Sequence, residues 1–114
     1  MYIMYVNNKQ EDNTMKTEII NEVKEIIANK KYHAEATTCG HLVDEWNAEA
    51  ENHAEAMVEK ATEEDIEKAF DECVKCGLAA NEVNAEHVLS EIGSTDLWKL
   101  GNHMENISVV VLPD

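Results

Sequence analysis

Cysteines and histidines at the spacing of zinc ligands are the side chains best suited to chemistry in this sequence. Cys73 and Cys76 have the C-x-x-C spacing that supplies two ligands of many structural zinc sites. Cys39 and His41, separated by one residue in a polar stretch, offer two more. The helix that follows Cys39 and the helix that carries Cys73 should form an antiparallel hairpin, which would bring the two pairs together. We therefore predict a structural zinc site made of Cys39, His41, Cys73 and Cys76, which would add folding free energy to a modest core.

Three other histidines are alternative ligands for the same ion. His87 should lie in the first turn of the helix after Cys76, and His33 near the end of the first helix. His53 should lie about one helical turn from the residue opposite Cys73. A single C-x-x-C motif is weak support for zinc, because free cysteine is often a small buried residue on a helix face. The alternative is that both cysteines, and His53 through a hydrogen bond, belong to the core.

The sequence contains no recognisable catalytic motif. It has no glycine loop that could hold a phosphate, no Gly-x-Ser-x-Gly nucleophile motif and no His-Glu-x-x-His metal motif. Cys39 and His41 are too close in sequence to align readily for proton transfer, and no third group that would orient them is evident. Cys73 and Cys76 as a redox pair would need a strand-helix-strand context, which the sequence lacks. We therefore expect a protein that binds a partner rather than an enzyme.

The balance of charges limits what the protein can bind. The 114 residues include 24 Asp and Glu residues but only nine lysines and no arginine, so the formal net charge is -15 at pH 7. Binding to a nucleic-acid backbone needs clustered positive charge, and arginine is the usual residue for phosphate recognition. Direct binding of DNA or RNA is therefore not expected. A strongly acidic protein suits a basic partner, such as the groove of a protein that itself holds nucleic acid.

Acidic residues are concentrated between Asp44 and Glu72, where twelve carboxylates accompany two lysines. Glu51, Glu55 and Glu59 are spaced four residues apart, so they should form a row along one helix face. Because successive helical turns are about 5.4 Å apart, we expect such a row to imitate nucleic-acid charges in a groove built for phosphates. The alternative is a solvated helix face. An even scatter of these acids around the molecule, or pairing of most of them with lysines, would remove the support for an inhibitor. The expected partner-binding residues are Asp44, Glu45, Glu49, Glu51, Glu55, Glu59, Glu63 and Glu64.

The hydrophobic pattern indicates one mainly α-helical domain that spans residues 1–114. Residues 2–6 and 107–112 are short runs of β-branched and aromatic side chains, and two strands at opposite ends of a chain would most simply pair. Between them, apolar residues recur at helical spacing. Helices are expected at about 14–30, 41–61, 62–77 and 84–93, with a last helical turn or two at 96–104. The expected architecture is a helical bundle of about four helices with a small two-stranded sheet formed by the chain termini.

Local signals mark the ends of two of these helices. Thr62 and Asp65 resemble a capping box, with Asp in place of the usual Glu. Gly77 is a good left-handed terminator for the helix that Thr62 begins. Asn84 should cap the helix that follows. These signals predict a turn near residue 62 and a short connection between residues 77 and 84.

The sequence shows no targeting or membrane segment. The first residues have no basic region followed by a long apolar run, and no window approaches the roughly 20 apolar residues of a membrane span. Three cysteines are an odd number and too few for a disulfide framework. The cytosol, where thiols stay reduced or bind metal, is therefore the expected location.

In overall character the chain resembles the anti-CRISPR proteins of phages and other mobile elements, including inhibitors of Cas9-type nucleases. The shared features are small size, strong acidity, a helical fold and the lack of a catalytic motif, rather than aligned positions, so no functional residue is carried over. The resemblance implies an inhibitor, in the host cytosol, that covers a nuclease's nucleic-acid-binding surface and blocks the loading of target DNA.

Two other functions are consistent with the same sequence. One is a zinc-stabilised adaptor or regulator that docks a host protein without imitating DNA, for example through Trp98 or Leu100. The other is an acidic, chaperone-like partner of a basic protein.

Overall fold

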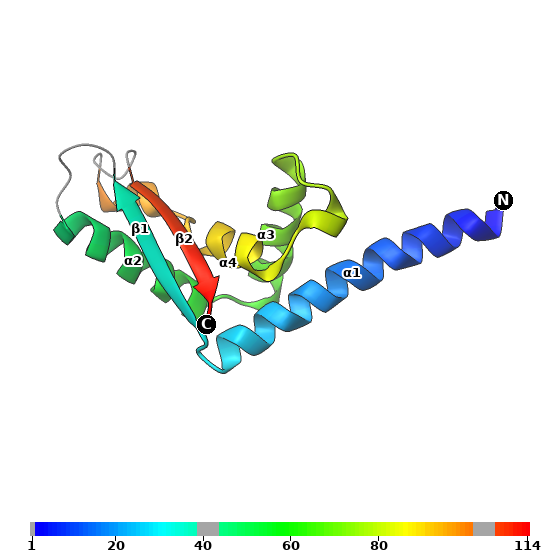
Figure 1. Ribbon diagram of the computed structural model, residues 1–114, viewed down its shortest axis with the longest axis horizontal. Coiled ribbons are helices and arrows are strands. Elements are labelled where there is room, and N and C mark those ends of the chain that lie inside the picture. Colours follow the sequence, from blue (N-terminus) through cyan, green and yellow to red (C-terminus); the bar gives the residue numbers. More distant parts are fainter. Residues whose placement is uncertain (1, 39–43, 102–106) are drawn as a thin grey trace.

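The computed structural model describes residues 2–38, 44–101 and 107–114, together with the side chains of 15–37, 46–101 and 107–114. This part of the chain contains four α-helices, two short 3-10 helices and a two-stranded antiparallel sheet (Figure 1). The expected fold class, a mainly helical protein of about four helices with a small two-stranded sheet, is therefore confirmed. The elements are α1 (Tyr2–Ala28), β1 (Tyr32–Thr38), α2 (Asp44–Glu59), α3 (Glu63–Lys75), η1 (Ala80–Glu82), α4 (Ala85–Gly93), η2 (Leu97–Leu100) and β2 (Ile107–Pro113).

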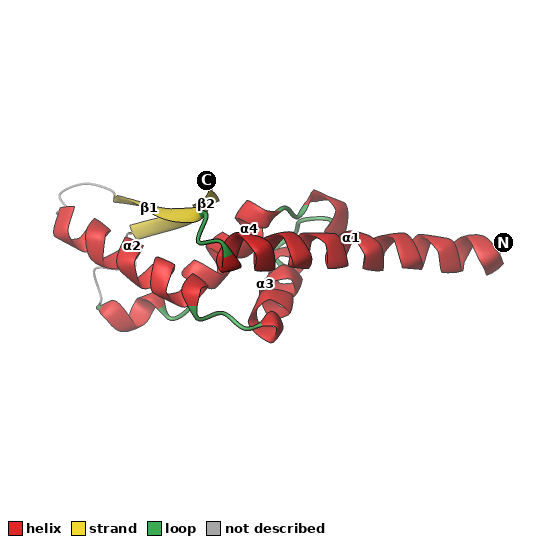
Figure 2. Ribbon diagram, turned by 90° about the horizontal axis from the view of Figure 1, so that it is seen from below, coloured by secondary structure: helices red, strands yellow, loops and turns green. Residues whose placement is uncertain are grey.

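The strand expected at residues 2–6 is wrong, because these residues form the first turns of α1. The segment 2–28 contains no glycine or proline, and each residue added to an existing helix gains a backbone hydrogen bond. Strand propensity is a weaker signal, since it mainly reflects packing on a pleated surface. The amino-terminal half of α1 extends away from the other elements (Figure 2), and the molecule is 58 Å long but only 29 by 21 Å across.

The true partner of β2 is β1, which runs antiparallel to it from the pair Tyr32 and Pro113 to the pair Thr38 and Ile107. Helices cover one face of this sheet (Figure 2). Ala34 on β1 and the alternate β2 residues 107, 109 and 111 are buried on that face, whereas Val110 is 40% exposed on the other. Pairing with β1 rather than with the first residues of the chain leaves α1 free to extend as a helix.

The core is built around α4, which contacts α2, α3 and β2. Val88, Leu89 and Ile92 are buried along this helix. At Gly93 a Cβ atom would lie 2.7 Å from Val111 Cγ2, closer than real Cβ atoms approach. It would also lie 3.1 Å from the Cβ of Ala54, a tight contact. Glycine is therefore needed where the end of α4 passes between β2 and α2.

The helix ends follow the local signals. Thr62 and Asp65 form a capping box, with Asp65 N–H donating to Thr62 Oγ1 and Thr62 N–H donating to Asp65 Oδ2. Asn84 caps α4 through a bond from the His87 N–H at 3.0 Å. Gly77 follows α3 with φ of 112°, a backbone conformation that L residues rarely adopt.

The antiparallel hairpin expected for α2 and α3 is wrong. From the turn at Thr62, α3 heads away from α2 and packs on α4 and α1 (Figure 1). The buried side chains of α3 explain this choice, because Ile66, Ala69, Phe70 and Cys73 lie on one face of the helix and meet the apolar residues of both neighbours in the core. A local cap sets where α3 begins, but its apolar face sets what it packs against.

Candidate functional site

Two of the glutamates expected to bind a partner instead hold the free edge of the sheet. Glu51 Oε2 accepts a hydrogen bond from the Ala36 N–H at 2.9 Å, and Glu55 Oε2 accepts one from the Ala34 N–H at 3.1 Å. Four residues of helix rise about 6 Å and two residues of strand about 6.8 Å, so alternate N–H groups of β1 match glutamates one turn apart on α2. An unpaired strand edge invites pairing with other chains, and these carboxylates occupy it.

The opposite edge of the sheet is held in a similar way by a hydroxyl group. Val111 N–H on β2 donates to Ser90 Oγ at 2.9 Å, and Ser90 Oγ donates to the Val111 carbonyl at 3.4 Å. Helices α2 and α4 therefore each contribute side chains that bond to one edge of the sheet.

The remaining members of the expected acidic set are only partly free. Glu59 lies 3.9 Å from the Lys30 ammonium, and Glu64 lies 3.4 Å from Lys68. Glu63 pairs with Lys24 of α1 at 3.3 Å. A continuous free row of Glu51, Glu55 and Glu59 on α2 is therefore not present. Of the other three acids, Glu49 is exposed, and the side chains of Asp44 and Glu45 lie outside the described ones.

Helix α3 is the most exposed acidic element whose side chains are described. It carries six acids and two lysines, all exposed, an excess of four negative charges in 13 residues. Lys16 of α1 pairs with Asp71 at 2.9 Å, and Lys75 pairs with Glu72 at 3.3 Å. Exposed pairs of this kind contribute about 0–1 kcal/mol and open readily, so their carboxylates stay accessible to a partner. The acids of α3 are Glu63, Glu64, Asp65, Glu67, Asp71 and Glu72.

The structure describes half of the predicted zinc site. Cys39 and His41 lie outside the described residues. Cys73 is buried and its thiol donates to the His87 carbonyl at 3.6 Å, whereas Cys76, the C-cap residue of α3, is exposed. Both cysteines and His87 line a hollow of about 300 Å³ between α3 and α4. Within the described residues, no three or more His, Cys, Asp or Glu side chains are arranged to hold a metal ion, so the zinc site stays a prediction.

Burial and nearby carboxylates affect the Cys73 thiol. Burial raises the pKa of Cys73, and electrostatic interactions with Glu91, Cys76 and Glu72 raise it further. A thiol whose pKa is raised stays protonated at neutral pH and is a poor nucleophile. Without a bound cation, Cys73 is therefore suited to packing rather than to redox chemistry.

The three alternative histidine ligands each have a ring nitrogen in a hydrogen bond. His53 Nε2 lies 2.8 Å from the Thr95 carbonyl oxygen, and His87 Nδ1 accepts from the Asn84 N–H at 3.3 Å. His33 Nδ1 lies against Asp114 Oδ1. This bond, followed by the charges of Asp114, Glu35 and Glu55, raises the pKa of His33 above its ordinary value, despite some desolvation.

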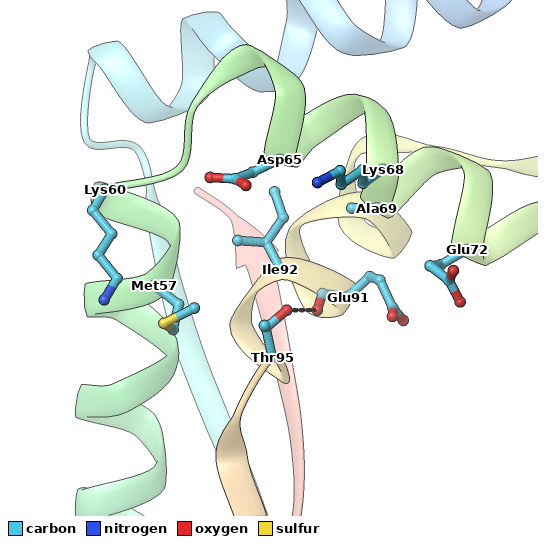
Figure 3. Close-up of a pocket in the computed structure, with 9 residues that line it drawn as sticks. All are labelled: Met57, Lys60, Asp65, Lys68, Ala69, Glu72, Glu91, Ile92 and Thr95. Atoms are coloured by element: carbon cyan, nitrogen blue, oxygen red, sulfur yellow. Dashed lines mark hydrogen bonds between the residues drawn. The ribbon is translucent and has the colours of Figure 1, made fainter. Parts of the chain in front are cut away.

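A groove that the sequence did not reveal opens between α2, α3 and α4. It has a volume of about 320 Å³, and Figure 3 shows the side chains that line it. Met57, Ala69 and Ile92 supply its apolar part, and charged side chains surround them. The groove exists because α3 packs on α4 and turns away from the carboxyl-terminal end of α2. No local sequence signal could indicate the direction that α3 takes.

One aromatic side chain of η2 stands out on the surface. Trp98 on η2 is 71% exposed, the largest exposure among the large apolar residues that the structure describes. The Lys99 ammonium lies 5.6 Å from the centre of its ring. Exposed tryptophan is frequent at the centres of protein interfaces.

Similarity to known proteins adds nothing to the geometry described above. In the part of the chain that the structure describes, no helix has both the length and the apolar character needed to span a membrane. No protein-family model, curated protein sequence or solved structure matched this chain.

Proposed function

We propose that this protein acts by binding a basic surface of a nucleic-acid-handling enzyme and thereby keeps nucleic acid from loading. The observation that supports this most is charge: a net charge of -15 without any arginine. The hydrogen bonds that Glu51 and Glu55 accept do not remove these residues from the acidic surface of α2. A field of this strength speeds the encounter with a basic partner and repels acidic ones.

The contact surface proposed here is centred on α3 rather than on the α2 row. Glu64, Glu67 and Asp71 are exposed on that helix, and the lysine partners of Glu64 and Asp71 can be displaced by a cationic surface at small cost. Glu49, Asp44 and Glu45 are further proposed contacts near the start of α2. A Cas9-type nuclease, whose channel binds polyanions, has the right charge for such a partner.

Charge reversal on α3 tests the proposal. A Glu64→Lys, Glu67→Lys, Asp71→Lys triple variant should lose most partner capture from cell extract at 50 mM salt, because each site changes from attraction to repulsion. Capture by the native protein should fall steeply between 50 and 300 mM salt. The matched control reverses Glu18, Glu22 and Glu25, three exposed acids of α1, and should retain capture. Equal loss in both variants, or capture that ignores salt, would refute the proposal.

A gel-shift assay tests directly whether the protein blocks DNA loading by a Cas9-type nuclease. Addition of the protein before target DNA should prevent a guide-loaded Cas9-type nuclease from shifting that DNA in a gel, and addition after the DNA should have little effect. Indifference to the order of addition would contradict competition with DNA.

The second candidate function is an adaptor that docks a host protein through Trp98. The exposure of this side chain favours it. In the capture assay, a Trp98→Ala variant that loses the partner while the α3 variant keeps it would select the adaptor. For this candidate the proposed zinc ion would act only as a structural support for the hollow that Cys73 and Cys76 line.

A further inference from the structure

We propose that the groove between α2, α3 and α4 is a docking site for a large apolar side chain that stands next to a lysine or arginine in a partner protein. This inference rests on the proposed function, because it assigns the chemistry of the basic partner at one site. The groove has a volume of about 320 Å³, enough for one large apolar or aromatic side chain.

The floor of the groove is apolar and already part of the core. Ala69 and Ile92 are buried at 5% and 4% exposure, and Met57 packs against the core from the edge of the groove. An apolar side chain placed here would remove the apolar surface that the groove still exposes from water, which favours binding. Methionine adapts its shape to different occupants, so the floor can accept more than one apolar residue type.

The charges at one end of the groove select a cationic neighbour. Glu72 and Glu91, from α3 and α4, lie on the same side in Figure 3, away from Lys60. Among the described residues, Glu91 has no lysine or histidine within ion-pair distance, and the lysine partner of Glu72 is exposed and easily displaced. A lysine or arginine beside the apolar anchor would therefore reach two carboxylates.

The other charged side chains of the groove do not cancel this preference. Lys60 and Lys68 also line the groove, and Lys68 lies 3.4 Å from Glu64 in an exposed pair. The three carboxylates of the lining, Asp65, Glu72 and Glu91, still outnumber these two lysines. An acidic segment would meet the Glu72 and Glu91 pair and the protein's net charge of -15. Charge complementarity thus favours a basic segment over an acidic one.

Three capped heptapeptides probe the site directly in the full-length protein. The first is Gly-Ser-Lys-Phe-Arg-Ser-Gly; the second replaces Phe by Gly, and the third replaces both basic residues by Glu. The first should shift the methyl NMR signals of Met57 and Ile92 saturably, with at least tenfold higher affinity than either other peptide. Failure to shift these methyls, or equal binding of the three peptides, would overturn the inference.

A pair of charge-matched variants separates a local effect from the overall field. Glu91→Lys should weaken binding of the first peptide at least fivefold, whereas Glu82→Lys, which makes the same charge change on exposed η1, should weaken it less than twofold. Equal effects of the two variants would overturn the docking site. If the first peptide binds as expected but no partner is captured, the proposed function is refuted and the docking site is not. If a partner is captured but the peptide does not bind, only the docking site is refuted.

Discussion

The hydrogen bonds from α2 to the edge of β1 can be tested by removing their acceptors. We predict that Glu51→Ala and Glu55→Ala each destabilise the protein, because they leave the N–H groups of Ala36 and Ala34 without their carboxylate partners. The opposite sign follows if these glutamates are only a stack of like charges on a solvated helix. In that case, removing one charge would stabilise the protein by about 0.2–0.5 kcal/mol.

The size of the effect follows from the burial of the bonds. A hydrogen bond to a charged group contributes about 1.5–3 kcal/mol, and a buried N–H left without an acceptor costs about 1–3 kcal/mol. Both bonds are part-buried, so water replaces some of what is lost. We therefore expect about 1–1.5 kcal/mol for each single variant and about 2–3 kcal/mol for the double variant. For a chain of this size, 1 kcal/mol lowers the Tm by about 3–6 °C.

Urea unfolding at pH 7, followed by circular dichroism at 222 nm, measures these differences. Glu51→Gln and Glu55→Gln keep a carbonyl acceptor and should lose less than half as much stability as the alanine variants. Glu49→Ala, an exposed position of the same helix, is the control and should change the free energy of unfolding by less than about 0.5 kcal/mol. The reasoning is refuted if Glu51→Ala and Glu55→Ala are no less stable than this control.

Three further predictions concern the core, the sheet and the metal. Gly93→Ala should destabilise the protein by about 1–3 kcal/mol through its clash with Val111, and the cost should shrink in a Val111→Ala background; simple additivity in urea melts would contradict the clash. The raised pKa of His33 means that its pair with Asp114 stabilises the fold below about pH 6.5 and that this contribution is lost as the pH rises through the raised pKa. Asp114→Asn should therefore cost more stability at pH 5.5 than at pH 9, and a pH-independent difference would exclude the pair. Removal of zinc with a chelator should lower the Tm, whereas an unchanged Tm with no zinc by elemental analysis would dismiss the metal site.

The misplaced strand shows where reasoning from local sequence stops. Residues 2–6 have the β-branched and aromatic side chains of a strand, yet they continue a helix. Residues 32–38 contain small and polar side chains and gave no strong strand signal, yet they pair with β2. What selects them is the position of that segment beside α2, where Glu51 and Glu55 can satisfy its outer N–H groups. The contacts that select β1 join residues 15 to 81 positions apart in the sequence, so local patterns do not reveal them.

Some features of the candidate sites could be predicted from the sequence, and others depend on the tertiary structure. The sequence alone established the net charge and the C-x-x-C motif, because these depend only on composition and spacing. It did not show that Lys16 and Lys24 of α1 would reach acids of α3, nor that a groove would open beside Met57. Both depend on the direction that α3 takes after the turn.

The sequence by itself determined the mainly helical class, the caps at Thr62 and Asn84 and the turn at Gly77, because each of these depends on interactions within a few residues. Only the tertiary structure decided which strand pairs with β2, which helix α3 packs against and which carboxylates remain free. The physical reason is that burial of apolar faces and pairing of backbone N–H groups are settled between segments far apart in the chain. Identical local signals therefore allow several arrangements, among which packing selects one.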